Sequence, residues 1–282
     1  MGVKIIIDSA SDMTRAEAEQ EGLIFLPLKT IFGEEEYLDG VTISHQEFYE
    51  KLKSSPVTPT TSQVAPAEFE EAYREAVQDG SKAVVITISE KLSGTYQSAM
   101  IAREGYEDHV FVVDSENGSL GEQILVRLAI RMREQGMTAE EMTGELEKAK
   151  KDICIIGLLD TLEYLKRGGR ISGMDAFAGA LLDIKPVIAL ENGVVISLGK
   201  ARGSKKGNNL LNEMVVRKGG IDFERPYCLG YSGLSDELLQ KYIRDSEYLW
   251  KDHTDKLPIG TLGSTIGTHA SPGGVVVAFF HK

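Results

Sequence analysis

The sequence predicts an α/β protein with a parallel sheet in its first half and a mixed sheet in its second half. The first half alternates short apolar runs, typical of buried parallel strands, with amphipathic helix patterns. The second half contains a hairpin signal, Glu191-Asn192-Gly193, between two apolar runs. The 282 residues suffice for two modest domains. We expect one domain over 1–152 and a second over 153–282, packed closely because no Pro/Gly/Ser-rich linker separates them.

The first half is expected to contain strands that alternate with helices. Pro66 stands near the start of one helix pattern, Gly136 stops a second, and a capping box at Thr138-Ala139-Glu140-Glu141 opens a third. Crossovers between parallel strands are nearly always right-handed, so helices should cover both faces of the sheet. The expected strands are 3–7, 23–28, 82–88 and 110–113, and the expected helices are 66–78, 119–135 and one from 139.

The second half is expected to form a mixed sheet backed by helices, because hairpins and helices are interspersed there. The expected strands are 153–159, 186–190, 194–198, 226–231 and 275–280, and the expected helices are a short one ending at Lys166, then 174–182, 204–218 and 235–250.

The charge is strongly negative and unevenly distributed. The net charge of −12 argues against nucleic acid and anionic membrane surfaces as partners. Residues 1–150 hold 14 Lys and Arg against 28 Asp and Glu, a net charge of −14, whereas residues 151–282 carry +2. The basic excess is either a solvated face or an anion or docking site. It gathers at Lys166, Arg167 and Arg170, and again at Lys200, Arg202, Lys205 and Lys206.

The remaining bulk features favour a cytoplasmic protein without a cofactor. No apolar run approaches the roughly 20 residues of a membrane helix, and residues 3–7 read as a strand rather than a signal segment. Cys154 and Cys228 lie in apolar runs without zinc or redox spacing, which indicates small buried side chains.

Clusters of hydroxyl groups follow several of the predicted strands. Asp8-Ser9, Ser93-Gly94-Thr95 and Asp114-Ser115 each come after an apolar run. Ligands of open α/β sheets bind beyond the carboxyl ends of the strands, and a helix start presents free N–H groups to an anion. Ser93 is a natural N-cap for the following helix, so the cluster is either a plain cap or part of an anion site.

Three further sites remain open between a structural and a functional interpretation. Thr60-Thr61-Ser62-Gln63 is either helix capping or part of the anion site. Asp8 and Asp12 are either turn-forming residues or a weak acidic metal site. His269 lies in a glycine-rich loop before a buried strand, whereas the other histidines (His45, His109, His253 and His281) read as surface residues. No nucleotide-binding, nucleophile-elbow or zinc-protease signature is present, so the residues indicate an anion-binding crevice without a catalytic engine.

Segments in family order over nearly the whole chain make it resemble the DegV family, whose members bind long-chain fatty acids. They are Asp8-Ser9-Ala10-Ser11-Asp12, Thr61-Ser62-Gln63, Leu92-Ser93-Gly94-Thr95-Tyr96, Val113-Asp114-Ser115, Leu165-Lys166-Arg167-Gly168-Gly169-Arg170-Ile171-Ser172, Ile184-Lys185-Pro186-Val187-Ile188, Ala201-Arg202, and Gly267-Thr268-His269 with Pro272-Gly273.

The resemblance implies a ligand held between the two domains. It implies that Thr61, with Ser62, and the Ser93-Gly94-Thr95 loop bind a fatty-acid carboxylate, and that the acyl chain enters an apolar tunnel. It further implies a separate ATP-binding kinase subunit that converts the carboxylate to an acyl phosphate. Arg170, Arg202 and His269 match positions near the head group and the partner surface.

Two rival hypotheses remain beside the lipid-binding subunit. One is a stand-alone small-molecule kinase or hydrolase that uses Asp8 and His269. The other is a regulatory or transport module for a different amphiphile. Tunnel-lining candidates are Phe177, Ala178, Ala180, Leu181 and Leu182, although plain core is the better interpretation of any one of them.

Overall fold

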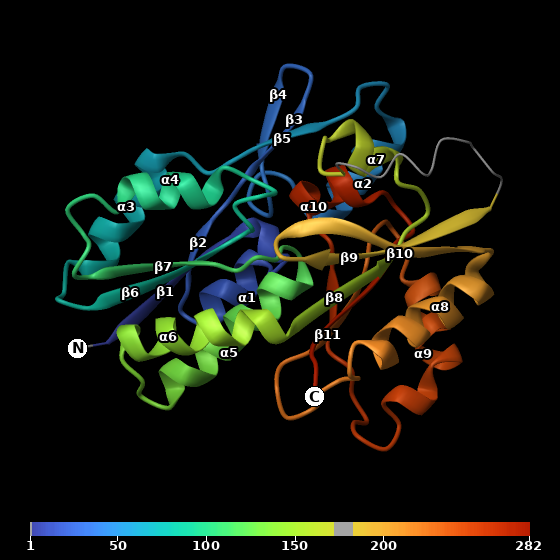
Figure 1. Ribbon diagram of the computed structural model, residues 1–282. Coiled ribbons are helices and arrows are strands. Elements are labelled where there is room, and N and C mark those ends of the chain that lie inside the picture. Colours follow the sequence, from blue (N-terminus) through green and yellow to red (C-terminus); the bar gives the residue numbers. More distant parts are fainter. Residues whose placement is uncertain (1, 172–182) are drawn as a thin grey trace.

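The computed structural model describes residues 2–171 and 183–282, and a parallel sheet forms its first layer (Figure 1). The strands are β1 (Val3–Asp8), β2 (Ile24–Leu26), β6 (Lys82–Thr87) and β7 (Val110–Asp114), in the order β2-β1-β6-β7. All neighbours pair in parallel, which confirms the predicted sheet. Successive side chains of a strand point to opposite faces. Accordingly, Ile5 and Ile7 join one apolar cluster and Ile6 joins another.

Helices cover both faces of this sheet, as right-handed crossovers require. One face packs on α3 (Pro66–Val77) and α4 (Thr95–Ala102). The other packs on α1 (Arg15–Gln20), α5 (Leu120–Glu134) and α6 (Ala139–Ala149). The expected capping box opens α6, with the Thr138 hydroxyl accepting from the Glu141 N–H.

The second half of the chain forms a six-stranded mixed sheet, also as predicted. The order β10-β9-β8-β13-β11-β12 is antiparallel except between β11 and β12. The predicted hairpin turn has positive φ at Asn192 (50°) and Gly193 (80°), the signature of a type I′ turn. The strands are β8 (Ile153–Leu158), β9 (Ile184–Glu191), β10 (Val194–Arg202), β11 (Cys228–Tyr231), β12 (Ile259–Thr261) and β13 (Val275–Phe280).

Two helices cover the outer face of the mixed sheet. These are α8 (Ser204–Arg217) and α9 (Glu237–Asp245), which share an apolar cluster with Ile156, Val275 and Val277. The predicted helix over 235–250 is too long, because a 3₁₀ turn at Glu247–Leu249 follows the end of α9. The expected helix 174–182 and the tunnel candidates Phe177, Ala178, Ala180, Leu181 and Leu182 lie outside the described residues.

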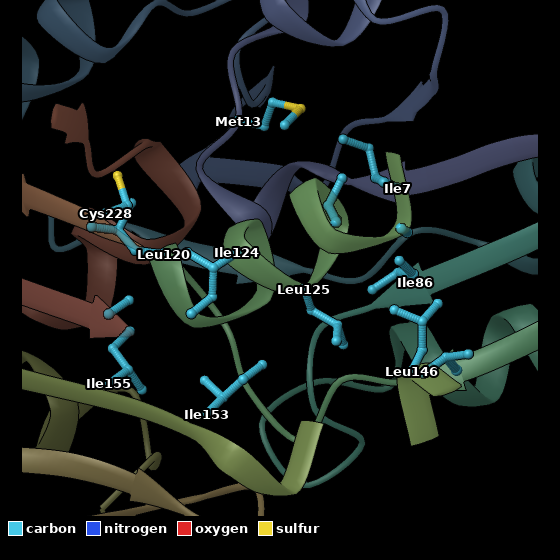
Figure 2. Close-up of a cluster of buried hydrophobic side chains, with 14 of the residues drawn as sticks. Ile7, Met13, Ile86, Leu120, Ile124, Leu125, Leu146, Ile153, Ile155 and Cys228 are labelled. Atoms are coloured by element: carbon cyan, nitrogen blue, oxygen red, sulfur yellow. The ribbon is translucent and has the colours of Figure 1, made fainter. Parts of the chain in front are cut away.

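Helix α5 lies between the two sheets (Figures 1 and 2). Figure 2 shows Leu120, Ile124 and Leu125 of α5 in one cluster with Ile7 and Ile86 of the parallel sheet and with residues of the mixed sheet (Ile153, Ile155 and Cys228). The interior is therefore continuous across the proposed boundary near residue 152, where the 3₁₀ turn Lys150–Asp152 runs directly into β8.

A third, small sheet and the helices α2 (His45–Ser54) and α10 (Ser264–Ala270) were not predicted, and neither were α1 and the edge strand β12. Strands β3 (Lys29–Phe32), β4 (Glu35–Leu38) and β5 (Thr60–Ser62) pair antiparallel in the order β4-β3-β5. They are short and polar, so they lack a hydrophobic period. The same holds for α10, which packs beside α2, β3 and β5.

The segment that contains His269 is thus helical as far as Ala270, so the expected loop around His269 is wrong. A Cβ on Gly267 would lie 2.6 Å from Tyr49 Oη and 2.7 Å from Phe48 Cε1. The glycine therefore serves the close packing of α10 on α2. Within the two described ranges, no helix combines the length and apolar character needed to cross a bilayer.

Candidate functional site

A cavity of about 290 Å³ lies between the two sheets, and most of its wall is apolar. Ile88 and Leu92 follow β6, while Gly118 and Ser119 precede α5. The mixed sheet supplies the largest apolar share of the wall, which sequence reasoning could not assign. These residues are Ile155 and Gly157 of β8, Ile188, Ala189 and Leu190 of β9, Val195 of β10 and Val276 of β13.

Polar groups from four segments that are distant in the sequence gather in one part of the wall. They are Thr61 and Ser62 of β5, Ser93 and Gly94 before α4, Arg170 after the short helix α7 (Glu163–Arg167), and His269 of α10. These are six of the eight site residues expected from the sequence. Gln63 also lines the cavity. Its side chain lies close to Gly94, where a Cβ would be 2.0 Å from Gln63 Oε1.

The side chains of Thr61 and His269 form a hydrogen bond. Thr61 Oγ1 lies 3.0 Å from His269 Nε2. Burial, and secondarily the Arg170 charge, lowers the pKa of His269 to about 4, so its ring is neutral near pH 7. The other ring nitrogen, Nδ1, is buried without a hydrogen-bond partner among the described residues and faces Gly168. An unpartnered N–H is costly to bury, so the preferred tautomer carries its proton on Nε2 and donates to Thr61.

Ser93 is not the N-cap of α4 that the sequence predicts, but the residue before it. The N-cap of α4 is Gly94, and the Ser93 hydroxyl accepts the Thr95 N–H at 3.3 Å. Ser93 Oγ also lies 2.9 Å from Thr95 Oγ1. The Thr95 side chain is fully buried and does not line the cavity, so its predicted direct contact with a ligand is not supported. When Thr95 donates to Ser93, the Ser93 proton is free to point into the cavity.

The Arg170 guanidinium is held by backbone carbonyl groups. Its Nε donates to Leu92 O at 3.0 Å and its Nη1 to Gly168 O at 2.6 Å. No carboxylate among the described residues forms an ion pair with it. Its positive charge therefore remains available to an anion in the cavity.

Arg202 is separated from these groups. It is exposed at the end of β10 and lines a second depression, not the cavity. Lys205, Lys206 and Asp183 share that depression. The structure therefore does not bring Arg202 to the expected head-group site, and only a role at a partner surface stays open as a prediction.

The acidic residues at and just after the end of β1, Asp8 and Asp12, serve the fold. Both Asp8 carboxylate oxygens accept backbone N–H groups, from Ala10 at 2.9 Å and Ile88 at 2.8 Å, and burial raises the Asp8 pKa to about 7. Asp12 accepts from Ser119 Oγ at 2.5 Å and from the Gly263 N–H at 2.7 Å. Neither carboxylate lines the cavity beside His269. In the part of the chain that the structure describes, no group of three potential ligands is arranged to hold a metal ion.

His45 is not the surface residue expected from its polar surroundings. It is half-buried, its Nδ1 lies 2.5 Å from Thr261 Oγ1, and burial lowers its pKa. Its position beside the start of α10 depends on α2, which carries it and was not predicted.

Comparisons with known proteins find relatives of nearly the whole chain. The model of the DegV family, a family of uncharacterised proteins, matches residues 2–282. A DegV domain-containing protein of Caldanaerobacter subterraneus is 32% identical over 99% of both chains.

Two solved structures share the architecture. One, of a DegV family protein from Thermus thermophilus, is described for its fatty acid binding. It is 32% identical with a TM-score of 0.88, over 99% of this chain and 100% of that one. The other, a stearic acid-binding protein from Eubacterium ventriosum, is 26% identical with a TM-score of 0.87, over 99% and 98% of the two chains.

Proposed function

Because the chain belongs to the DegV family, we propose that it binds a long-chain fatty acid in the cavity between its two sheets and presents the carboxylate to a separate ATP-binding kinase subunit. The observation that carries the proposal is the pairing of an apolar cavity with a cluster of neutral donors from Thr61 and Ser93 and the nearby Arg170. The named relatives support the same ligand class, since two of them bind fatty acids by their own descriptions.

The apolar wall accounts for the affinity. Each buried methylene contributes about 0.8 kcal/mol, so a chain of about fifteen contributes roughly 12 kcal/mol before the costs of binding are subtracted. Ile155, Ile188, Leu190 and Val276 supply the contact surface along the sheet. Burial of methylene groups favours long and apolar ligands, but it does not distinguish one end of the ligand from the other.

The polar cluster accounts for recognition of the head group. A buried carboxylate must receive hydrogen bonds, or it becomes protonated or is expelled. With His269 Nε2–H donating to Thr61, the Thr61 hydroxyl is free to donate to the ligand, as is the Ser93 hydroxyl. Arg170 adds a positive charge, which compensates that of the carboxylate and, after phosphorylation, the added charge of the acyl phosphate.

The partner would supply the nucleotide. The sequence contains no phosphate-binding loop for ATP. The basic groups Arg202, Lys205 and Lys206 lie together outside the cavity, where an acidic partner surface is able to dock. A partner that consumes ATP would place the pair in the cytoplasm.

Binding is tested with lipid-free protein. We expect a long-chain fatty acid to bind more tightly than its methyl ester by at least about tenfold, because the ester loses the charge-assisted hydrogen bonds. Equal affinity for the two would remove the carboxylate site. With a kinase subunit and ATP, the acid should be converted to an acyl phosphate. Turnover of ATP without that subunit would instead favour the stand-alone enzyme.

A further inference from the structure

Two buried carboxylates from distant parts of the chain cap the amino end of α10. The N-cap residue, Gly263, has no side chain to satisfy the first N–H groups of this helix. Asp12 Oδ1 accepts the Gly263 N–H at 2.7 Å, and Asp39 accepts those of Ser264 and Thr265 at 2.9 and 3.2 Å. The two aspartates are 2% and 1% exposed, so these bonds are protected from water.

Each aspartate is itself anchored in the first half of the chain, Asp39 through its backbone and Asp12 through its side chain. The Asp39 backbone N–H donates to Leu28 O at 2.9 Å, and its side chain also accepts from Ser264 Oγ at 2.7 Å. Asp12 Oδ2 accepts from Ser119 Oγ. The approach leaves no room for a side chain at Gly263, where a Cβ would lie 3.1 and 3.2 Å from oxygens of the two aspartates and 2.9 Å from His45 Nε2.

Helix α10 carries this anchoring to the cavity. It has only seven residues and rises about 1.5 Å per residue, so its capped start and His269 lie within two turns of each other. Thr265, Ile266 and His269 on this helix line the cavity. The middle of α10 packs closely on α2 at Gly267, and His269 near its end forms a hydrogen bond with Thr61.

We propose that Asp39, assisted by Asp12, is a positioning residue for the head-group site: it fixes the start of α10 and thereby sets the His269 ring against the Thr61 hydroxyl. The proposal rests on the proposed function for its ligand, but the position of His269 can be measured without one.

The test uses the full chain with Asp39→Ala and Asp39→Asn. The alanine removes all acceptors, whereas the asparagine keeps one oxygen for Ser264 and turns an NH₂ group toward the Thr265 N–H. Thr138→Ala is the matched control, since it removes the cap of α6, no residue of which lines the cavity.

The first measurement compares the affinity for a long-chain fatty acid with that for the primary alcohol of the same chain length. We expect Asp39→Ala to weaken binding of the acid about tenfold and of the alcohol less than about twofold, with Asp39→Asn in between. Thr138→Ala should leave the ratio unchanged. An unchanged ratio in the Asp39 variants would overturn the proposal, because a general loss of fold weakens both ligands equally.

The second measurement is the titration of the His269 ring by ¹⁵N NMR in ligand-free protein. We expect the His269 ring to stay neutral well below pH 6 in the wild type and in Thr138→Ala. In the Asp39 variants we expect the pKa of this ring to lie nearer its ordinary value. Should Asp39→Ala fail to fold, Asp39→Asn decides. If the wild type binds no fatty acid, the proposed function fails, while this titration still decides the positioning role. A His269 titration that does not change in the folded variants contradicts it.

Discussion

Thr61 and His269 are 208 residues apart in the chain, and their side chains meet at 3.0 Å. Thr61 belongs to β5 of the small antiparallel sheet, and His269 belongs to α10. The proposed head-group site therefore exists only when the small sheet and the end of the chain are both folded. This makes it sensitive to changes that leave most of the core intact.

Removing either hydroxyl of the cluster should weaken fatty-acid binding. A hydrogen bond to a charged group is worth about 1.5–3 kcal/mol, so Thr61→Val and Ser93→Ala should each reduce affinity roughly 10- to 100-fold. Isothermal titration of lipid-free protein measures this directly. Thr143→Val is the control, because that hydroxyl only bonds to Ala139 O within α6. Wild-type affinity in both site variants would exclude these hydroxyls as carboxylate ligands.

The neutral state of His269 should make stability depend on pH in a defined window. Its folded pKa of about 4 lies below the ordinary value of 6.5, so the unfolded chain binds more protons between these values. The stabilisation is complete above pH 6.5 and declines as pH falls toward 4. Between pH 6.5 and 4, the free energy of unfolding of the wild type, measured with urea, should fall by about 1–3 kcal/mol more than that of His269→Gln. Parallel curves for the two proteins would show that the ring is not held neutral by the fold.

The contact between α10 and α2 should not tolerate a methyl group. In Gly267→Ala, the new Cβ would lie within 3 Å of Tyr49 Oη and Phe48 Cε1, and overpacking of this kind costs about 1–3 kcal/mol. Gly144→Ala in α6 is the matched control, since nothing lies within 4 Å of its Cβ and helix propensity alone should stabilise it by up to about 1 kcal/mol. Chemical unfolding measures both. Equal stability of the two variants would contradict the close packing.

A larger side chain in the apolar wall of the cavity should make the protein select fatty acids with shorter chains. A Cβ on Gly157 would make ordinary contacts of 3.6 Å with Ile188 and 3.7 Å with Val276, so Gly157→Val fits the strand while its methyl groups reduce the cavity. Mass spectrometry of the extracted lipid should show shorter acyl chains than in the wild type. An unchanged distribution would mean that the chain does not pass along β8.

Loss of the exposed Arg202 should separate binding from turnover. Because this side chain lies outside the cavity, Arg202→Ala should bind fatty acid normally but lower acyl-phosphate formation by a kinase subunit about tenfold. Arg74→Ala, an exposed change on α3, should alter neither quantity. Undiminished turnover by Arg202→Ala would remove the partner role.

The sequence predicted most strands of the two large sheets because these strands are apolar, and it missed only the three-residue edge strand β12. β6 and β13 are nearly continuous apolar runs, and the turn at Asn192-Gly193 specifies its hairpin locally. The third sheet was missed because its strands have three or four residues, with polar sequences such as that of β5. Such strands are held by tertiary pairing, which leaves no period in the sequence.

The site was predictable in its residue types but not in its geometry. Hydroxyl clusters after strands, and the family resemblance, pointed to Thr61, Ser93 and His269. The helical state of the segment around His269 was hidden, because its cap comes from Asp39, more than 200 residues earlier. Long-range hydrogen bonds of this kind carry no local signature, and the same is true of the separation of Arg202 from the cavity.

Native mass spectrometry of the protein purified from cells, followed by extraction of its lipid, is the most direct test of fatty-acid binding. We expect one long-chain fatty acid per chain, retained by the wild type and largely lost from a protein that carries Thr61→Val and Ser93→Ala together. A wild-type protein that carries no lipid and takes up none when offered would contradict the proposed function.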